Sequence, residues 1–472
     1  MFADVSGRIA HNPPALHYGV AVADVDGDGR FEFVVAGFGC ANRVLKWAGG
    51  QLRDVAPPEL ADADRQAIGL AAGDLDGDGT EELYVLNTDT YSGPKLFADR
   101  LFKRLPDGRW EDLFSHPENK LARNLAAGRS VAVIDRRGVG RYGFFVANYA
   151  RPMRLYELGP DGRLLDLAPP LDLNPTTGGR GLLAAPFLSD HTDLFCVNEQ
   201  GPNLLFRNRG DGTFEECAAG LNLADAKEHG RGVTAVDAGD GRLAVCWGNW
   251  EGPHRLMLRR PDGPWKDRAT AGLAFPSAVR TVIAADFDND GHDEIFFNNI
   301  GEPNRLFRIL ASRDLASPDR EVGGSATLEI TMLDPGAALE PDGRGTGAAV
   351  ADLDGDGVLE LLVSHGESEA QPLSLYRSRG AEGNGWLRVR PLTRFGAPAR
   401  GALVRAECGD RVRVKLIDGG SGYLCQMEPV AHFGLGNEPR IDRVTVSWPD
   451  GAELTMTDPD LNCTYSVPYP RG

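Results

Sequence analysis

The chain has 472 residues, of which 42% are hydrophobic and 59 are glycine, enough for one large domain with many tight turns and a smaller second domain. Its net charge of −18 argues against nucleic acid and anionic membranes as partners. The start, MFADVSGRIAHNPPALHYG, lacks a basic region followed by an apolar run, and no segment reaches the roughly 20 apolar residues of a membrane span. Together with seven scattered cysteines, this predicts a cytoplasmic protein with reduced thiols, or a secreted one if a leader was trimmed.

Four nearly identical segments reveal an internal repeat. They are ADVDGDGRFEFVV from Ala23, GDLDGDGTEELYV from Gly73, ADFDNDGHDEIFF from Ala285 and ADLDGDGVLELLV from Ala351. Weaker copies from Val131, Leu182 and Val233 fill the gap, so the first loop positions are 24, 74, 135, 186, 237, 286 and 352. A period of this length is typical of propellers and other repeat folds.

Each repeat predicts four strands, of which the first is small and apolar, as in VAVA from Val20. The fourth has an apolar residue followed by an acid, as in WEDL from Trp110, and this pattern also occurs as FADV from Phe2. We therefore expect an all-β fold: a seven-bladed β-propeller over residues 1–380, in which the N-terminal strand completes blade seven and closes the ring. Residues 381–472 are expected to form a small C-terminal β domain.

The acidic loops of the four strong copies have the residue types of a calcium site. Carboxylates at loop positions one, three, five and nine surround a glycine turn, and the carbonyl at position seven adds a further oxygen, which is the donor set that Ca²⁺ prefers. Without a cation, each pair of carboxylates 4 Å apart would repel by roughly 1–4 kcal/mol. Solvated acidic turns are the alternative. The predicted ligands of about four Ca²⁺ ions are Asp24, Asp26, Asp28, Arg30 and Glu32; Asp74, Asp76, Asp78, Thr80 and Glu82; Asp286, Asp288, Asp290, His292 and Glu294; and Asp352, Asp354, Asp356, Val358 and Glu360.

The third to fifth repeats have lost this pattern. In the third, Arg137 and Val139 occupy positions three and five, so no cation is expected there and the arginine is expected to supply the positive charge.

These repeats resemble the FG-GAP/VCBS repeats of integrin-type propellers. In the tail, Trp386–Arg390, Gly401–Arg405, Gly422–Gly436 and Ile441–Gly451 are similar to the ASPIC/UnbV domain. The chain thus resembles the cartilage acidic protein 1-like family, as a bacterial-type member. The resemblance implies a calcium-binding propeller with a β-rich C-terminal cap, and it implies no particular activity.

A second candidate site lies six residues before each loop. The residues at this register are Tyr18, Ile68, Arg129, Arg180, Arg231, Arg280 and Thr346. In a propeller, equivalent positions meet around the axis, so the four arginines are expected at one mouth of the channel, about 20 Å from the metal loops. The predicted ligand-binding residues are Arg129, Arg180, Arg231, Arg280, Tyr18, Asn148, Tyr149, Asn249 and Trp250.

The alternative is structural: the arginines tie neighbouring blades through Glu199, Glu251 or Glu302, and the asparagines cap turns.

Two functions fit this pattern. The first is a binding module for a protein, peptide, glycan or anionic small molecule. The second is a cytosolic biosynthetic enzyme acting on an anionic small molecule in the same pocket, which an unpaired acid or a tyrosine beside the arginines would favour. The chain has no paired histidines for zinc and no GxSxG, P-loop or dinucleotide motif, and we expect His432 to be structural.

Overall fold

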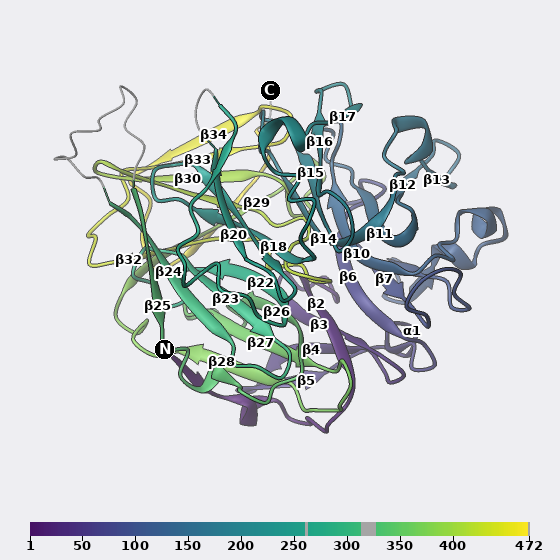
Figure 1. Ribbon diagram of the computed structural model, residues 1–472, viewed down its shortest axis with the longest axis horizontal. Coiled ribbons are helices and arrows are strands. Elements are labelled where there is room, and N and C mark those ends of the chain that lie inside the picture. Colours follow the sequence, from purple (N-terminus) through teal and green to yellow (C-terminus); the bar gives the residue numbers. More distant parts are fainter. Residues whose placement is uncertain (260–262, 313–326, 471–472) are drawn as a thin grey trace.

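The computed structural model describes residues 1–259, 263–312 and 327–470. Seven antiparallel units surround a central axis, and each innermost strand contacts the innermost strands of the two neighbouring blades (Figure 1). The small side chains of these strands allow this close approach. The predicted all-β, seven-bladed propeller with a small C-terminal β unit is confirmed.

The strands of blades one to four follow the chain order from the axis outward. They are β2 (His17–Ala23), β3 (Glu32–Gly37), β4 (Arg43–Ala48) and β5 (Gln51–Asp54); β6 (Ala67–Gly73), β7 (Glu82–Asn87), β8 (Arg100–Arg104) and β9 (Trp110–Asp112); β10 (Gly128–Ile134), β11 (Gly143–Pro152), β12 (Arg154–Leu158) and β13 (Leu164–Asp166); and β14 (Thr176–Ala185), β15 (Asp193–Asn198), β16 (Leu204–Asn208) and β17 (Phe214–Glu216).

Blades five to seven complete the ring. Their strands are β18 (Gly230–Asp237), β19 (Leu243–Asn249), β20 (Arg255–Arg259) and β21 (Trp265–Asp267); β22 (Val279–Ala285), β23 (Glu294–Asn299), β24 (Arg305–Ser312) and β25 (Thr327–Leu333); and β26 (Gly345–Ala351), β27 (Glu360–His365), β28 (Ser374–Ser378) and β1 (Phe2–Asp4). Helical turns are short: α1 (Pro58–Ala61), η1 (Ser6–Arg8), η2 (Leu113–Ser115), η3 (Pro117–Ala122), η4 (Pro169–Leu171), η5 (Ala219–Leu221) and η6 (Ala337–Leu339). No helix in the described part of the chain is long and apolar enough to cross a membrane.

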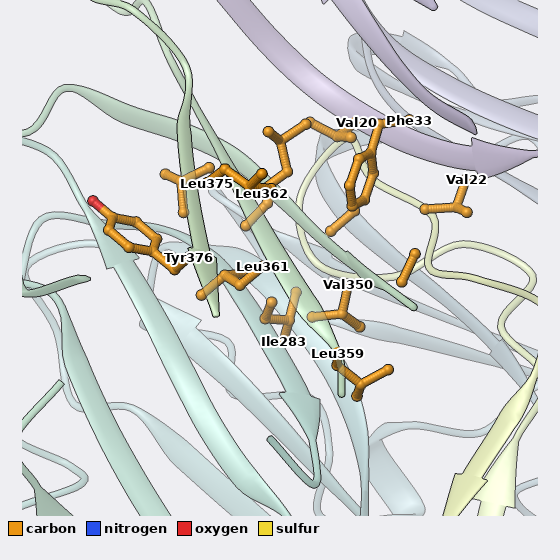
Figure 2. Close-up of a cluster of buried hydrophobic side chains, with 14 of the residues drawn as sticks. Val20, Val22, Phe33, Ile283, Val350, Leu359, Leu361, Leu362, Leu375 and Tyr376 are labelled. Carbon is orange, nitrogen blue, oxygen red and sulfur yellow. The ribbon is translucent and has the colours of Figure 1, made fainter. Parts of the chain in front are cut away.

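The ring is closed by the N-terminal strand. β1 pairs with β28 as the outermost strand of blade seven, and the N-terminus lies beside β28 in Figure 1. Phe2 is buried, and its ring lies 5.0 Å from that of Phe287 in an edge-to-face contact. The same apolar cluster continues through Val20 and Phe33 of blade one and Leu362 of blade seven (Figure 2), so closure buries a continuous core.

The C-terminal unit consists of β29–β35. One sheet has the order β32 (Ala431–Gly436), β29 (Gly385–Pro391), β35 (Thr464–Val467), and the other has the order β31 (Arg411–Leu416), β30 (Leu403–Cys408), β33 (Arg443–Ser447), β34 (Glu453–Thr457). The predicted division between residues 380 and 381 falls between β28 and β29 and stays a prediction.

The connection between β31 and β32 enters the channel of the propeller. We call residues 418–428 the plug; all eleven are buried. Its backbone exchanges hydrogen bonds with Val233 of blade five in both directions, at 2.7 and 2.8 Å, and with Val20 and Val22 of blade one, each at 3.0 Å. Further backbone bonds reach β6, β10 and β26. The C-terminal unit therefore fills the axis of the propeller as well as capping it.

Candidate functional site

The four acidic loops share one turn geometry. In each, the N–H of the glycine at position six donates to the carboxylate at position one at 2.9–3.0 Å, as Gly29 does to Asp24. The glutamate at position nine accepts from the N–H of position two at 2.7–3.1 Å, as Glu32 does from Val25. The N–H groups at position seven bond the position-five carboxylates; these residues are Arg30, Thr80, His292 and Val358. The turn thus holds the carboxylates in a fixed arrangement.

These loops have the chemistry of hard-cation sites. In each loop, three carboxylate oxygens lie within 4.8 Å of one another. The Oδ1 atoms of Asp24, Asp286 and Asp288 are buried and have no hydrogen-bond partner among the described residues. Burial raises the pKa of Glu32 to about 7 and that of Glu82 to about 8, so a nearby cation would stabilise their ionised forms. The groups are Asp24, Asp26 and Glu32; Asp74, Asp76 and Asp78; Asp286, Asp288 and Asp290; and Asp352, Asp354 and Asp356.

Each acidic loop also has a basic residue from the third strand of its own blade. In blade one, the Nζ of Lys46 lies 2.7 Å from Asp28 and 3.3 Å from Glu32, and it also contacts Asp26. Its equivalents in the other three blades are Lys103, Arg308 and Arg377. Each of the four acidic loops therefore forms ion pairs with a basic side chain of its own blade.

Blade three has the opposite arrangement. The third-strand residue at this place is an acid, Glu157, and it pairs with the buried Arg136 at loop position two. Arg137, which we expected to supply the charge, is exposed, so the expectation named the wrong one of two adjacent arginines. Among the described residues of blades three to five, no acidic group with the spacing of a metal site occurs.

The arginine register at the opposite end coincides with a β-bulge in every blade. In blade three, Gly128 pairs with Asn148 and Ser130 with Ala147, so Arg129 between them has no partner residue. The same shift interrupts the pairing of the two inner strands in the other six blades. A bulge redirects the side chain of the extra residue, which brings these positions to the channel mouth.

Three of the four guanidinium groups pair with two glutamates. Arg180 and Arg231 both pair with Glu199, with Arg231 donating to its Oε1 at 2.7 Å. Arg280 pairs with Glu367. Arg129 forms no ion pair within the described chain and donates to backbone carbonyls. The Nε atoms of all four arginines are buried and have no acceptor among the described residues.

The pKa values of these groups reflect the excess of arginines over glutamates at the mouth. Burial raises the pKa of Glu199, but Arg180 and Arg231 outweigh it and bring the pKa to about 2. Burial lowers the pKa of Arg231 to about 10, and the positive charge of Arg180 adds to this. Glu199 therefore stays ionised, and positive charge at the mouth is only partly compensated.

Aromatic rings stack on the arginines. Tyr149 lies 4.8 Å from the Arg180 guanidinium, measured to the ring centroid, and Trp250 lies 4.8 Å from that of Arg280 and 5.3 Å from that of Arg231. The face of an aromatic ring attracts a cation electrostatically, so these contacts stabilise the guanidinium groups at the mouth.

The mouth contains a pocket of about 480 Å³. Of the predicted ligand-binding residues, the four arginines, Tyr18 and Trp250 line it. Asn148, Tyr149 and Asn249 do not; the two asparagines are buried, and each donates to a proline carbonyl at 2.7 Å, as turn caps do. Glu251 and Glu302, the other proposed blade ties, form no ion pair with these arginines among the described residues.

Sequence reasoning missed several residues of the pocket. Tyr423, in the plug, accepts a hydrogen bond from Arg180 at 3.0 Å. Burial favours its neutral phenol, but the four arginines outweigh that effect and lower the pKa of Tyr423. Glu367, Phe38 and Leu424 also line the pocket, together with Tyr91, which the sequence places in a loop on this face. Glu367 lies in a loop without a repeated pattern, and no local pattern places the tail of the chain inside the channel.

Fold and sites together define an FG-GAP-type β-propeller with an additional C-terminal unit. The family described as FG-GAP-like repeat matches residues 24–85 and 238–297, and the family described as ASPIC and UnbV matches residues 393–472. Cartilage acidic protein 1 of Xenopus tropicalis is 47% identical over 98% of this chain and 75% of its own length. The Homo sapiens protein is 48% identical over 98% of this chain and 73% of its own length. The chain belongs to the cartilage acidic protein 1 family.

Among solved structures, BBS1N in complex with ARL6DN is similar over 80% of this chain and 96% of its own, with a TM-score of 0.45 and 12% identity. This similarity is too low to support a functional argument.

Proposed function

We propose that this protein is a calcium-stabilised binding module that recognises an anionic ligand at the arginine-lined mouth of its channel. The observation that carries the proposal is the charge imbalance there: four arginines converge on one pocket, and only two glutamates pair with them. Buried guanidinium donors without acceptors favour a carboxylate or phosphate, whose oxygens match the guanidinium fork.

Calcium has a structural role in this proposal. The four acidic loops of blades one, two, six and seven would hold it through their aspartates and glutamates, and it would neutralise carboxylates that otherwise repel one another. The loops join the inner strands at the ends opposite the arginines. The ions would therefore stabilise the blades and would not touch the ligand.

A second candidate function is an enzyme acting on an anionic small molecule in the same pocket. Tyr423 favours it, because a buried phenol with a lowered pKa beside four arginines is suited to accept or donate a proton. The binding module remains the first proposal, since it needs only the arginines and the pocket.

The binding proposal is tested with Arg231→Ala and Arg280→Ala, assayed with acetate and inorganic phosphate by calorimetry at saturating calcium. Each variant is expected to weaken anion binding by more than tenfold, since a buried ion pair contributes more than about 1.4 kcal/mol. Arg280 is less buried than Arg231, so Arg280→Ala should disturb folding less and keeps the test valid if Arg231→Ala does not fold. Arg53→Ala, an exposed arginine on β5, is the control. Unchanged affinity in both folded variants would refute an arginine site.

A further inference from the structure

The mouth of the channel has two chemically different sides. At the shared register, blades three to six provide the arginines, whereas blades one and two provide Tyr18 and Ile68. Both kinds of residue line the same pocket. An anion alone would need only the first side.

The apolar side is a continuous wall. The ring of Tyr18 lies 5.3 Å from that of Phe38, and both pack against one cluster that includes Ile68 and Leu424. Leu424 belongs to the plug and has a φ of 67°, a conformation that leucine rarely adopts. The plug thus places an apolar side chain in this wall despite a conformational cost.

The charges of the pocket indicate the valence of the ligand. Besides Glu199 and Glu367, Asp89 is the third acid in the lining, and its carboxylate accepts from the backbone N–H groups of Leu96 and Phe97. Four guanidinium groups therefore face three carboxylates, which leaves one positive charge. A monoanion balances it.

We propose, building on the anion site above, that the ligand is an organic monocarboxylate with an apolar body. Its carboxylate contacts the arginines of blades three to six, and its body lies against Tyr18, Phe38, Ile68 and Leu424. A bare anion would leave the apolar wall in contact with water, and a dianion would exceed the available charge. A free acid and the C-terminus of a peptide with an apolar last residue share this chemistry.

The test compares probes that carry the carboxylate (the head), the apolar chain (the body) or both. Octanoate has both, acetate has only the head, and octan-1-ol has only the body; binding is measured by calorimetry at saturating calcium. Each methylene that leaves water strengthens binding by about fourfold. Octanoate is therefore expected to bind at least 30-fold more tightly than acetate and than octan-1-ol. An N-acetylated tripeptide ending in leucine, with a free or an amidated C-terminus, distinguishes a peptide from a free acid.

Two variants separate this inference from the proposed function. Phe38→Ala, at a half-buried position, should weaken octanoate binding at least fivefold more than it weakens acetate binding, whereas Arg280→Ala should weaken both by a similar factor. Phe275→Ala, an exposed phenylalanine outside the pocket, is the control. Equal binding of octanoate and acetate, both lost in Arg280→Ala, would overturn the monocarboxylate inference and leave the anion site intact. Binding that is insensitive to Arg280→Ala, or octan-1-ol binding as tightly as octanoate, would overturn both.

Discussion

Glu199 is the residue on which the charge state of the mouth depends. It pairs with both Arg180 and Arg231, and it also accepts from the Tyr91 hydroxyl at 3.2 Å. The same carboxylate therefore stabilises the protein and competes with an anionic ligand. Stability and binding should respond to its removal in opposite directions.

Glu199→Gln is expected to lower the free energy of unfolding at pH 7 by about 2–3 kcal/mol, because two buried arginines lose their partner. The folded-state pKa is depressed to about 2 from 4.5, so the stabilisation is present above pH 4.5 and is lost as the pH falls from 4.5 toward 2. Urea unfolding of both proteins across this range measures the difference. The same variant should bind small anions at least tenfold more tightly, since one competing charge is removed.

Glu251→Gln is the matched control, since Glu251 is exposed on a loop of the same face. It should change neither quantity. A Glu199→Gln protein with weaker anion binding would show that Glu199 organises the arginines for the ligand instead of competing with it.

At the scale of the element, the calcium loops and the third strands form one unit. The position-nine glutamate lies opposite a base on the neighbouring strand in the four acidic blades, as in the pair Glu294 and Arg308. This base occupies part of the space between the carboxylates that a cation would share. It offsets carboxylate repulsion without calcium and opposes calcium binding electrostatically.

Lys46→Met should therefore raise the calcium affinity of the first loop by at least tenfold and lower the stability of the calcium-free protein. The physical reason is the loss of a positive charge 2.7 Å from Asp28 while the apolar part of the side chain is kept. Calcium titration calorimetry at low ionic strength measures the affinity. Lys266→Met, an exposed lysine on β21, serves as the control. Lower affinity in Lys46→Met would show instead that the lysine positions the carboxylates.

The sequence predicted the elements whose signals are local and repeated. The four DxDxDG loops, the seven small inner strands and the FADV strand that closes the ring each have a pattern within one segment, and the fold class followed from them. The arginine register predicted which side chains meet, because a repeat places equivalent residues around one axis. It did not predict the bulge that turns them into the mouth, which depends on the pairing of two strands.

The plug was missed because its partners are far away in the sequence. Tyr423 and Arg180 are 243 positions apart, and a contact of this kind has no local pattern. Two glycines in the sequence are consistent with the plug. Gly19 and Gly347 directly follow the shared register, and a Cβ atom at Gly19 would lie 2.1 Å from the carbonyl oxygen of Leu424. Small residues there leave room for a segment inside the channel, although glycine is also ordinary in a crowded inner strand.

For the whole molecule, the plug joins the C-terminal unit to the propeller. It hydrogen-bonds inner strands on several sides of the axis, and Arg400 of the C-terminal unit is buried against Glu81 of blade two, with a donor–acceptor distance of 2.6 Å. Partial unfolding of either part would expose these contacts. We therefore expect the propeller and the C-terminal unit to unfold together.

Removal of calcium should consequently lower the melting temperature of one transition that includes both parts. Calorimetric scans with calcium and with EGTA measure it, and metal analysis of the calcium-loaded protein should give about four equivalents. Ions that bind only the folded state at a hundredfold excess over Kd contribute about 3 kcal/mol per site, so a shift on the order of 10 °C is expected. Asp74→Asn should reproduce part of the shift, whereas Asp211→Asn, an exposed turn aspartate of blade four, should not. A melting temperature unchanged after confirmed loss of metal, or a C-terminal transition that calcium does not move, would contradict this coupling.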